Sequence, residues 1–133
     1  MWVLARWWPL IRFEVPWPAL SGLFVASLGG VVSSAGMREF KRAKTTVNPL
    51  HPDRATSLVT SGIYRFTRNP MYVGIVFVLL GCFVAFGAAS ALLGLPVFIG
   101  YITLYQIQPE ERALLAKFGS EYASYTAQVR RWL

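Results

Sequence analysis

Charged side chains are scarce in this chain of 133 residues. Asp, Glu, Lys and Arg together make up 14% of it, and none of them occurs between Asn69 and Pro109. A soluble domain carries about 25% charged residues, so this chain lacks the polar surface that would face water on all sides. Because 55% of its residues are hydrophobic, we expect it to fold as one domain in a bilayer.

Cysteine and histidine each occur once. Cys82 has no partner, which excludes an intrachain disulfide and a multi-cysteine metal site, and we expect it to pack as a small buried hydrophobe. His51 lies in a turn-like stretch, where a lone histidine is expected to be structural. The chain also lacks Ser-His-Asp, HExxH, P-loop and GxGxxG arrangements. No metal site is therefore predicted.

Acidic residues are outnumbered, with 6 Asp and Glu against 13 Lys and Arg and a formal charge of +7. The basic residues adjoin apolar stretches instead of exposed aromatics, so we expect anionic lipid headgroups as partners and no nucleic acid. Many of the basic residues fall in residues 38–68. The positive-inside rule places that loop in the cytoplasm.

Three apolar stretches are candidates to cross a bilayer core of ~30 Å, which takes ~20 helical residues. They cover residues 17–37, 71–86 and 91–108. The last two are predicted to form a hairpin that turns at residues 87–90, and Pro96 is expected to kink the third span. The predicted fold is an all-α integral membrane helical bundle of about three spans, with its C-terminus in the cytoplasm.

The segment before the first span is rich in tryptophan. Residues 1–16 alternate Trp2, Trp7 and Trp8 with Arg6 and Arg12, a composition typical of an interfacial segment at headgroup level. No short apolar core with a small-residue cleavage site follows, so we expect no removable signal peptide.

Small residues recur every four positions along the first span, at Gly22, Ala26, Gly30 and Ser34. Such a stripe lets another helix approach closely. Packing inside the bundle is the favoured interpretation, and homodimerisation is the alternative.

A second periodic pattern follows the third span and predicts one amphipathic helix over residues 110–129. Its apolar face consists of Leu114, Phe118, Tyr122, Tyr125 and Val129. Glu110 continues this face backwards, whereas Glu111 lies about 100° round the helix, so Glu110 is the better site candidate. The plain alternative is that Pro109 opens a helix whose first turn carries acids to complement the helix dipole.

Polar residues gather just before the second span. Asn69 followed by Pro70 predicts a helix start with Asn as its cap, and the positive end of that helix suits a carboxylate or a phosphate. Tyr64, Arg68 and Tyr72 stand four apart, where Arg68 could contact a carboxylate and the tyrosine rings could hold a cation. Interfacial tyrosines beside a snorkelling arginine are the alternative interpretation.

Together these motifs resemble the isoprenylcysteine carboxyl methyltransferase and phospholipid methyltransferase superfamily. The resemblance runs from about Thr46 to the C-terminus and rests on Leu-Val-Thr-x-Gly-x-Tyr, Arg-x-Pro-x-Tyr-x-Gly, a Glu-Glu pair and Phe-Gly-x-x-Tyr-x-x-Tyr. Members are integral membrane enzymes that bind S-adenosylmethionine without a Rossmann sheet, in a pocket closed by cytoplasmic C-terminal helices. The resemblance implies a multi-pass protein of the bacterial inner membrane with a site that faces the cytoplasm.

Carried over by motif, the resemblance also implies site residues. The implied cofactor contacts are Leu58, Val59, Tyr64, Arg68, Asn69, Pro70, Tyr72 and Glu110. The implied catalytic residues are Arg68, Glu110 and Glu111. Asn69 departs from the family, which commonly has His there. Gln106 stands at the substrate-facing position where the isoprenylcysteine enzymes have Arg, which weighs against a carboxylate substrate.

The sequence thus predicts a methyltransferase that uses S-adenosylmethionine and acts on a lipophilic acceptor. The nearest alternative is an NADPH-dependent membrane sterol-type reductase, but such enzymes typically carry an acid after Tyr-x-Gly, where this chain has Ile75. A small non-catalytic membrane protein is the alternative from another class. The predicted spans hold no acid or base, which argues against proton-coupled transport.

Overall fold

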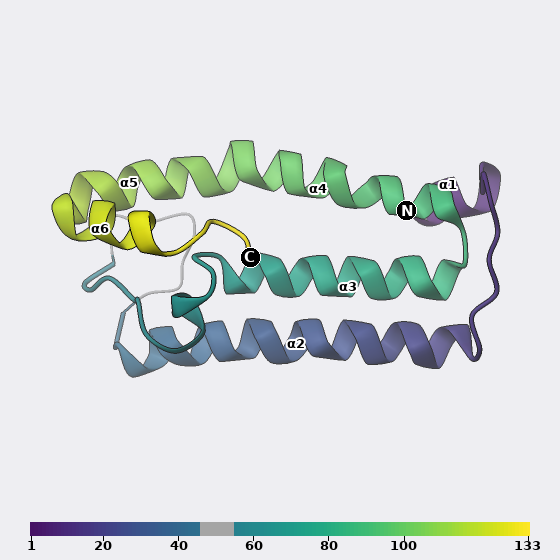
Figure 1. Cartoon of the computed structure of the whole chain (residues 1–133), viewed down its shortest axis with the longest axis horizontal. Coiled ribbons are helices and arrows are strands. Elements are labelled where there is room, and N and C mark those ends of the chain that lie inside the picture. The colour runs from purple at the N-terminus through teal and green to yellow at the C-terminus, as the bar shows by residue number, and fades with distance from the viewer. Residues whose placement is uncertain (46–54) are drawn as a thin grey trace.

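The structure, a computed structural model, describes residues 1–45 and 55–133, and all the regular elements in those residues are helices. Three long rods lie side by side, as Figure 1 shows. They are α2 (Pro18–Arg42), α3 (Pro70–Phe86), and a rod that runs from α4 (Gly94–Ile102) into α5 (Gln108–Phe118). Helix α1 (Trp2–Trp7) lies at one end of the bundle, and α6 (Ser120–Gln128) folds back at the other. The predicted all-helical fold class is confirmed for these residues. The predicted structural role of His51 lies outside them.

Helices α2 (Pro18–Arg42) and α3 (Pro70–Phe86) both begin with proline, which is favoured there because the first N–H of a helix has no intrahelical partner. Helix α2 ends with Lys41 and Arg42 in its last turn, where cations complement the helix dipole. Helix α3 ends at Gly87, whose φ of 57° favours glycine. The helix predicted over 71–86 is confirmed, whereas the first helix continues beyond residue 37.

Glycine contacts bring α2 and α3 together. A methyl group added to Gly22 would lie 2.6 Å from the Gly81 carbonyl oxygen, and one added to Gly29 would clash with the Gly74 carbonyl. On both helices these glycines are seven residues apart. Seven residues make nearly two whole turns, so the glycines stay on one face. The two backbones therefore touch along the length of the pair.

The four-residue stripe predicted on α2 is only half correct. Gly22 and Ala26 face α3 near Gly81, whereas Gly30 is exposed and has nothing within 4 Å of an added methyl group. Each step of four residues turns the helix by about 400° and so drifts by about 40°, which carries Gly30 and Ser34 off the α3 face. Homodimerisation through this stripe stays a prediction.

The third rod is one continuous helical stretch whose pitch changes along it. It consists of η3 (Ala89–Leu93), α4 (Gly94–Ile102), η4 (Thr103–Ile107) and α5 (Gln108–Phe118). Element η4 is a widened, π-helical turn. In a regular α-helix Pro109 would leave the Tyr105 carbonyl without a donor and its ring would clash with that carbonyl, and the wider turn relieves both. The third predicted span therefore runs into α5 without a break.

Two residues divide the helices differently from the prediction. Pro96 lies in the first turn of α4, directly after the 3-10 turn η3, so the change of pitch lies before it. Gly119 splits the helix predicted over 110–129 into α5 and α6 (Ser120–Gln128). Its φ of 52° and ψ of −122° are accessible to glycine, and the chain reverses there (Figure 1). The prediction of a single C-terminal helix is wrong.

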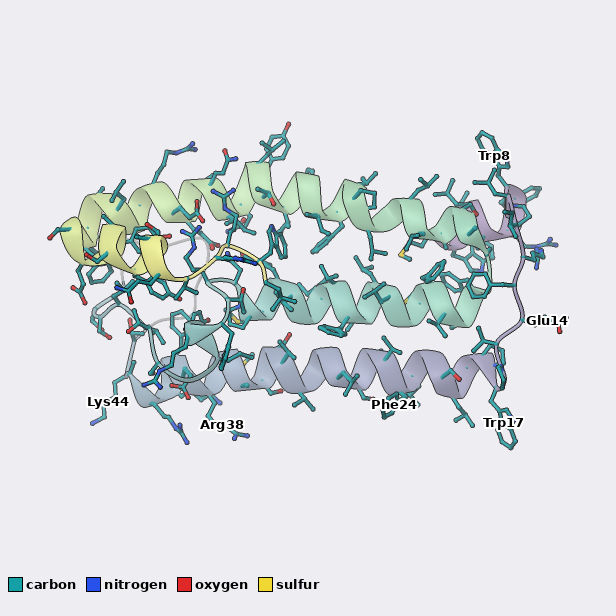
Figure 2. The ribbon with its side chains drawn as sticks, viewed as in Figure 1. Trp8, Glu14, Trp17, Phe24, Arg38 and Lys44 are labelled. Carbon is teal, nitrogen blue, oxygen red and sulfur yellow. The ribbon has the colours of Figure 1, made fainter. Side chains whose placement is uncertain are left out.

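The N-terminal segment packs against the C-terminal end of α3 and the turn that follows it. Helix α1 (Trp2–Trp7) packs Ala5 against Ala88 and Ala91, and backbone hydrogen bonds join residues 9–13 to residues 87–90. Trp8 and Trp17 stay exposed and point outward at this end, as Figure 2 shows. An interfacial position for these tryptophans stays a prediction.

Within the described residues, two helical stretches are long and apolar enough to cross a membrane: α2 and the continuous helix Ala89–Phe118. Only 17% of the most apolar part of α2 and 22% of that of Ala89–Phe118 are buried inside the protein. Because so much apolar surface is exposed, these helices need surroundings other than water. Helix α3 has 17 residues and is shorter than such a span. Figure 2 places Arg38 and Lys44 at the end opposite Trp17. We call the end with Arg38 and Lys44 the basic end. Three spans and their orientation stay predictions.

Candidate functional site

One cavity at the basic end gathers the residues predicted to contact a cofactor. It measures about 230 Å³ and lies among the end of α2, the turn η2 (Gly62–Arg65), the start of α3, and helices α5 and α6. Every predicted cofactor contact lines it, and so does Glu111. The lining residues are Phe40, Ala55, Ser57, Leu58, Val59, Tyr64, Arg68, Asn69, Pro70, Met71, Tyr72, Ile107, Glu110, Glu111, Leu114, Tyr122 and Tyr125.

Glu110 is held at the cavity wall by two hydrogen bonds. The Tyr72 hydroxyl donates to Oε1 at 2.9 Å, and Gln106 Nε2 donates to the same oxygen at 2.6 Å. Gln106, predicted to contact substrate, is not among the residues that line the cavity. Since Tyr72 comes from α3 and Gln106 from the third rod, two rods fix the direction of one carboxylate.

Glu111 lines the same cavity but is engaged by two arginines. Arg131 binds it bidentately, with Nε donating to Oε1 at 2.9 Å and Nη2 to Oε2 at 2.7 Å. Arg68 Nη1 lies 3.2 Å from Oε1. The cavity therefore reaches both acids although they point in different directions from α5. Glu110 is an oriented acceptor, whereas Glu111 joins α5 to the C-terminal tail.

The C-terminal tail is also bonded to the segment before α3. The backbone N–H of Arg68 donates to the Arg130 carbonyl at 3.0 Å, and the side-chain Nδ2 of Asn69 donates to the Arg131 carbonyl at 2.9 Å. The Asn69 N–H donates to Thr67 Oγ1 at 3.1 Å. The prediction that the Asn69 side chain caps α3 is wrong, because that side chain makes no cap hydrogen bond and its Nδ2 bonds to the tail instead.

Tyrosine rings form much of the cavity wall. The Tyr125 hydroxyl donates to the Tyr64 carbonyl at 2.8 Å and so joins α6 to η2. Burial raises the pKa of Tyr64 and of Tyr125 well above the usual value, so both phenols stay protonated. Burial also raises the pKa of Tyr122, although the Arg68 charge acts in the opposite direction. Neutral aromatic faces near one carboxylate suit an organic cation.

Arg68 carries a buried side-chain donor that is unsatisfied among the described residues. Its Nε makes no hydrogen bond within the described residues, although Nη1 pairs with Glu111. Leaving a buried N–H without an acceptor costs about 1–3 kcal/mol. A ligand with a carboxylate or another acceptor would remove that cost.

Glu39 supports the site, although no role was predicted for it. It is 8% exposed, accepts the Ser61 hydroxyl at 2.6 Å and pairs with Arg42 at 3.1 Å. Gly62 has a φ of 57°, and a methyl group added there would lie 2.6 Å from the Glu39 carboxyl carbon. These contacts hold η2, which carries Tyr64, against α2. An acid in the last turn of a helix opposes the helix dipole, and this was the available signal in the sequence.

Comparison with known proteins identifies the family. The model of the phospholipid methyltransferase family matches residues 2–121. The chain belongs to this family. It is 43% identical over 63 residues to an uncharacterized protein of Haemophilus influenzae, an alignment that covers 47% of this chain and 100% of that protein.

Two further relatives of this family member carry a named activity. The protein-S-isoprenylcysteine O-methyltransferases of Xenopus laevis and Homo sapiens are 26% and 25% identical to it over 116 and 122 residues. The alignments cover 87% and 92% of this chain but only 40% and 43% of those proteins. No solved structure matches the chain. The predicted resemblance is confirmed, and the apolar helices agree with a membrane methyltransferase family.

Other polar candidates in this family member lie away from the cavity. Cys82 is partly buried in α3 and does not line it. In residues 1–45 and 55–133 no group of three or more His, Cys, Asp and Glu side chains could hold a metal ion. The side chains that line the cavity include four tyrosine rings, two carboxylates and one guanidinium group.

Proposed function

We propose that this protein transfers a methyl group from S-adenosylmethionine to a lipophilic acceptor at the membrane boundary. The observation that carries the proposal is the oriented Glu110 carboxylate in a cavity walled by tyrosines, in a chain that belongs to a methyltransferase family. S-adenosylmethionine supplies an electrophilic methyl group on a cationic sulfur. The proposed site therefore needs groups that hold a cation and exclude water.

The residues of the cavity have the chemistry to hold this cofactor. The faces of Tyr64, Tyr72, Tyr122 and Tyr125 can stabilise a positive charge. Glu110 can accept hydrogen bonds from an amino group or from ribose hydroxyls. Arg68 Nε, which has no partner within the described residues, can donate to the cofactor carboxylate. The first turn of α3 lies at the same wall and favours an anion.

Positioning is the main contribution that these residues make in the proposed reaction. Holding the methyl donor and the acceptor in line replaces a bimolecular encounter with a reaction inside one complex, which can supply several kcal/mol. Glu111 is not a free general base, because both of its oxygens are bonded to Arg131. A thiolate or carboxylate acceptor needs none, whereas an amine would lose its proton to solvent.

A calorimetric titration of the detergent-purified protein tests the choice of cofactor. We expect S-adenosylmethionine and S-adenosylhomocysteine to bind and NADPH to give no heat. Binding of NADPH alone would replace the methyltransferase with the reductase, and no binding by any of the three would favour a non-catalytic membrane protein. Transfer of a labelled methyl group into a lipid extract then tests the class of acceptor.

The orientation belongs to the same proposal, with the cavity facing the cytoplasm. Thr60 and Glu14 are exposed. Glu14 lies at the end opposite Arg38 (Figure 2), whereas Thr60 precedes Ser61, which bonds to Glu39 at the basic end. In a Cys82→Ser background, a cysteine at position 14 should react with a membrane-impermeant reagent outside intact cells, and one at position 60 should not. The reverse labelling would overturn the orientation.

A further inference from the structure

A second hollow lies on the outer side of the ion pairs that join Arg68, Glu111 and Arg131. It measures about 620 Å³ and is bounded by α5, α6 and the C-terminal tail. Arg68, Glu111 and Tyr122 line both this hollow and the first cavity, so they form the wall between the two. We call it the arginine hollow, because Arg112 contributes a third guanidinium group to its lining.

The arginine hollow carries an excess of positive charge. Three arginines and one acid of the described residues line it. That acid, Glu111, already binds Arg131 bidentately and pairs with Arg68. Arg112 is exposed and forms no ion pair with any described residue. The cluster thus has two positive charges more than its own carboxylate can balance. An anion is the ligand that this arrangement favours.

The depth of the hollow in the bilayer indicates where such an anion comes from. The uncharged run of the sequence ends at Pro109, Gln108 lines the hollow, and Arg112 lies one turn farther along α5. This is where an apolar helix leaves the hydrocarbon core and meets the headgroups. Leu115, which also lines the hollow, is 49% exposed and gives it an apolar edge. A phosphate attached to a lipid fits this position better than one free in water.

We propose that the arginine hollow binds the phosphate of an anionic membrane lipid. Arg112 and Arg131 contact the phosphate oxygens through their planar donor groups, and Arg68 adds positive charge at the inner wall. The lipid is a ligand of the protein at a site separate from the methyl acceptor. The lipid site does not depend on the proposed methyl transfer. It shares only the wall formed by Arg68, Glu111 and Tyr122 with the first cavity.

Thermal unfolding of the full chain in detergent, without any cofactor, tests this site. The probes are short-chain phosphatidylglycerol, phosphatidylcholine of the same chain length, and inorganic phosphate. The variants are Arg112→Gln and Lys117→Gln, because Lys117 is an exposed cation of the same helix that does not line the hollow. Both variants lose one positive charge, so they separate a specific site from general attraction.

Phosphatidylglycerol is expected to raise the Tm of the wild type and of Lys117→Gln more than phosphatidylcholine does. The concentration of phosphatidylglycerol that gives half of this gain should rise about three- to ten-fold in Arg112→Gln, the loss of one charged contact. An equal gain in Arg112→Gln would overturn the site. A full gain with inorganic phosphate alone would overturn its assignment to a lipid.

Discussion

The two ends of the bundle are held together by different interactions. We call the end that carries Trp8 and Trp17 the tryptophan end (Figure 2). There, residues 9–13 are joined to residues 87–90 by backbone hydrogen bonds, and small alanines pack beside them. At the basic end, Glu39, Glu110 and Glu111 each have two side-chain partners. Buried polar networks are costly unless fully bonded, so they are retained where they do something more than hold helices together. This difference supports the proposal that the basic end carries the function.

The largest effect is expected in the middle, where both ends depend on one helix contact. Gly29→Val should lower the free energy of unfolding by about 3 kcal/mol, because the added side chain meets the α3 backbone at Gly74. Gly30→Val is the matched control, with open space around it. Denaturant unfolding in detergent measures both. Equal losses in the two variants would mean that Gly30 also packs against a helix, as a homodimer requires.

A smaller loss should be confined to the basic end. Glu111→Gln leaves Arg68 and Arg131 without their carboxylate, so unfolding should cost about 2 kcal/mol less. Limited trypsin digestion should then cut the C-terminal tail first, since the tail loses its tie to α5. Glu121→Gln, in the exposed first turn of α6, is the control. A tail that stays resistant would show that its backbone hydrogen bonds suffice.

Glu39 offers a test of how the basic end is positioned. Glu39→Ala should weaken binding of S-adenosylhomocysteine by about 1 kcal/mol, since η2 and its Tyr64 lose the bond from Ser61. Glu39→Gln should restore most of the affinity, because its amide oxygen still accepts that hydroxyl. Calorimetry compares the three proteins. No recovery in Glu39→Gln would mean that the charge, not the position of η2, matters.

The smallest effect on the site is expected from the tryptophan end. Trp7→Ser should leave the affinity for S-adenosylhomocysteine within about two-fold of the wild type, as for a surface change far from the ligand. It should reduce contact with lipid, measured by the quenching of tryptophan fluorescence with brominated lipids. A large loss of ligand affinity would show that the two ends are coupled.

Helix positions could be predicted where a local residue sets them. Pro70 begins α3 and Gly87 ends it, and both act through their own backbone. The face on which α2 packs was predicted less well, because a four-residue repeat and a seven-residue repeat diverge only over several turns. The break at Gly119 was missed because the apolar spacing continues through it.

The site shows the same division between local and distant interactions. As predicted from the motifs, the implied cofactor contacts between Leu58 and Tyr72 meet Glu110 and Glu111 at one cavity. The pairing of Glu111 with Arg131, and the use of the Asn69 amide by the tail, depend on the chain reversal at Gly119. No local pattern reveals a contact made by such a reversal. The roles of the cavity residues in binding a cofactor stay predictions.

The central claim is that Glu110 at the basic end binds the cofactor. Calorimetric titration with S-adenosylhomocysteine of the wild type, Glu110→Gln and the control Cys82→Ala tests it most directly. Binding should be equal in the wild type and Cys82→Ala and weaker by about 1–3 kcal/mol in Glu110→Gln, the loss of a charged hydrogen bond. An unchanged affinity in a folded Glu110→Gln protein, or no binding to the wild type at millimolar ligand, would contradict the account.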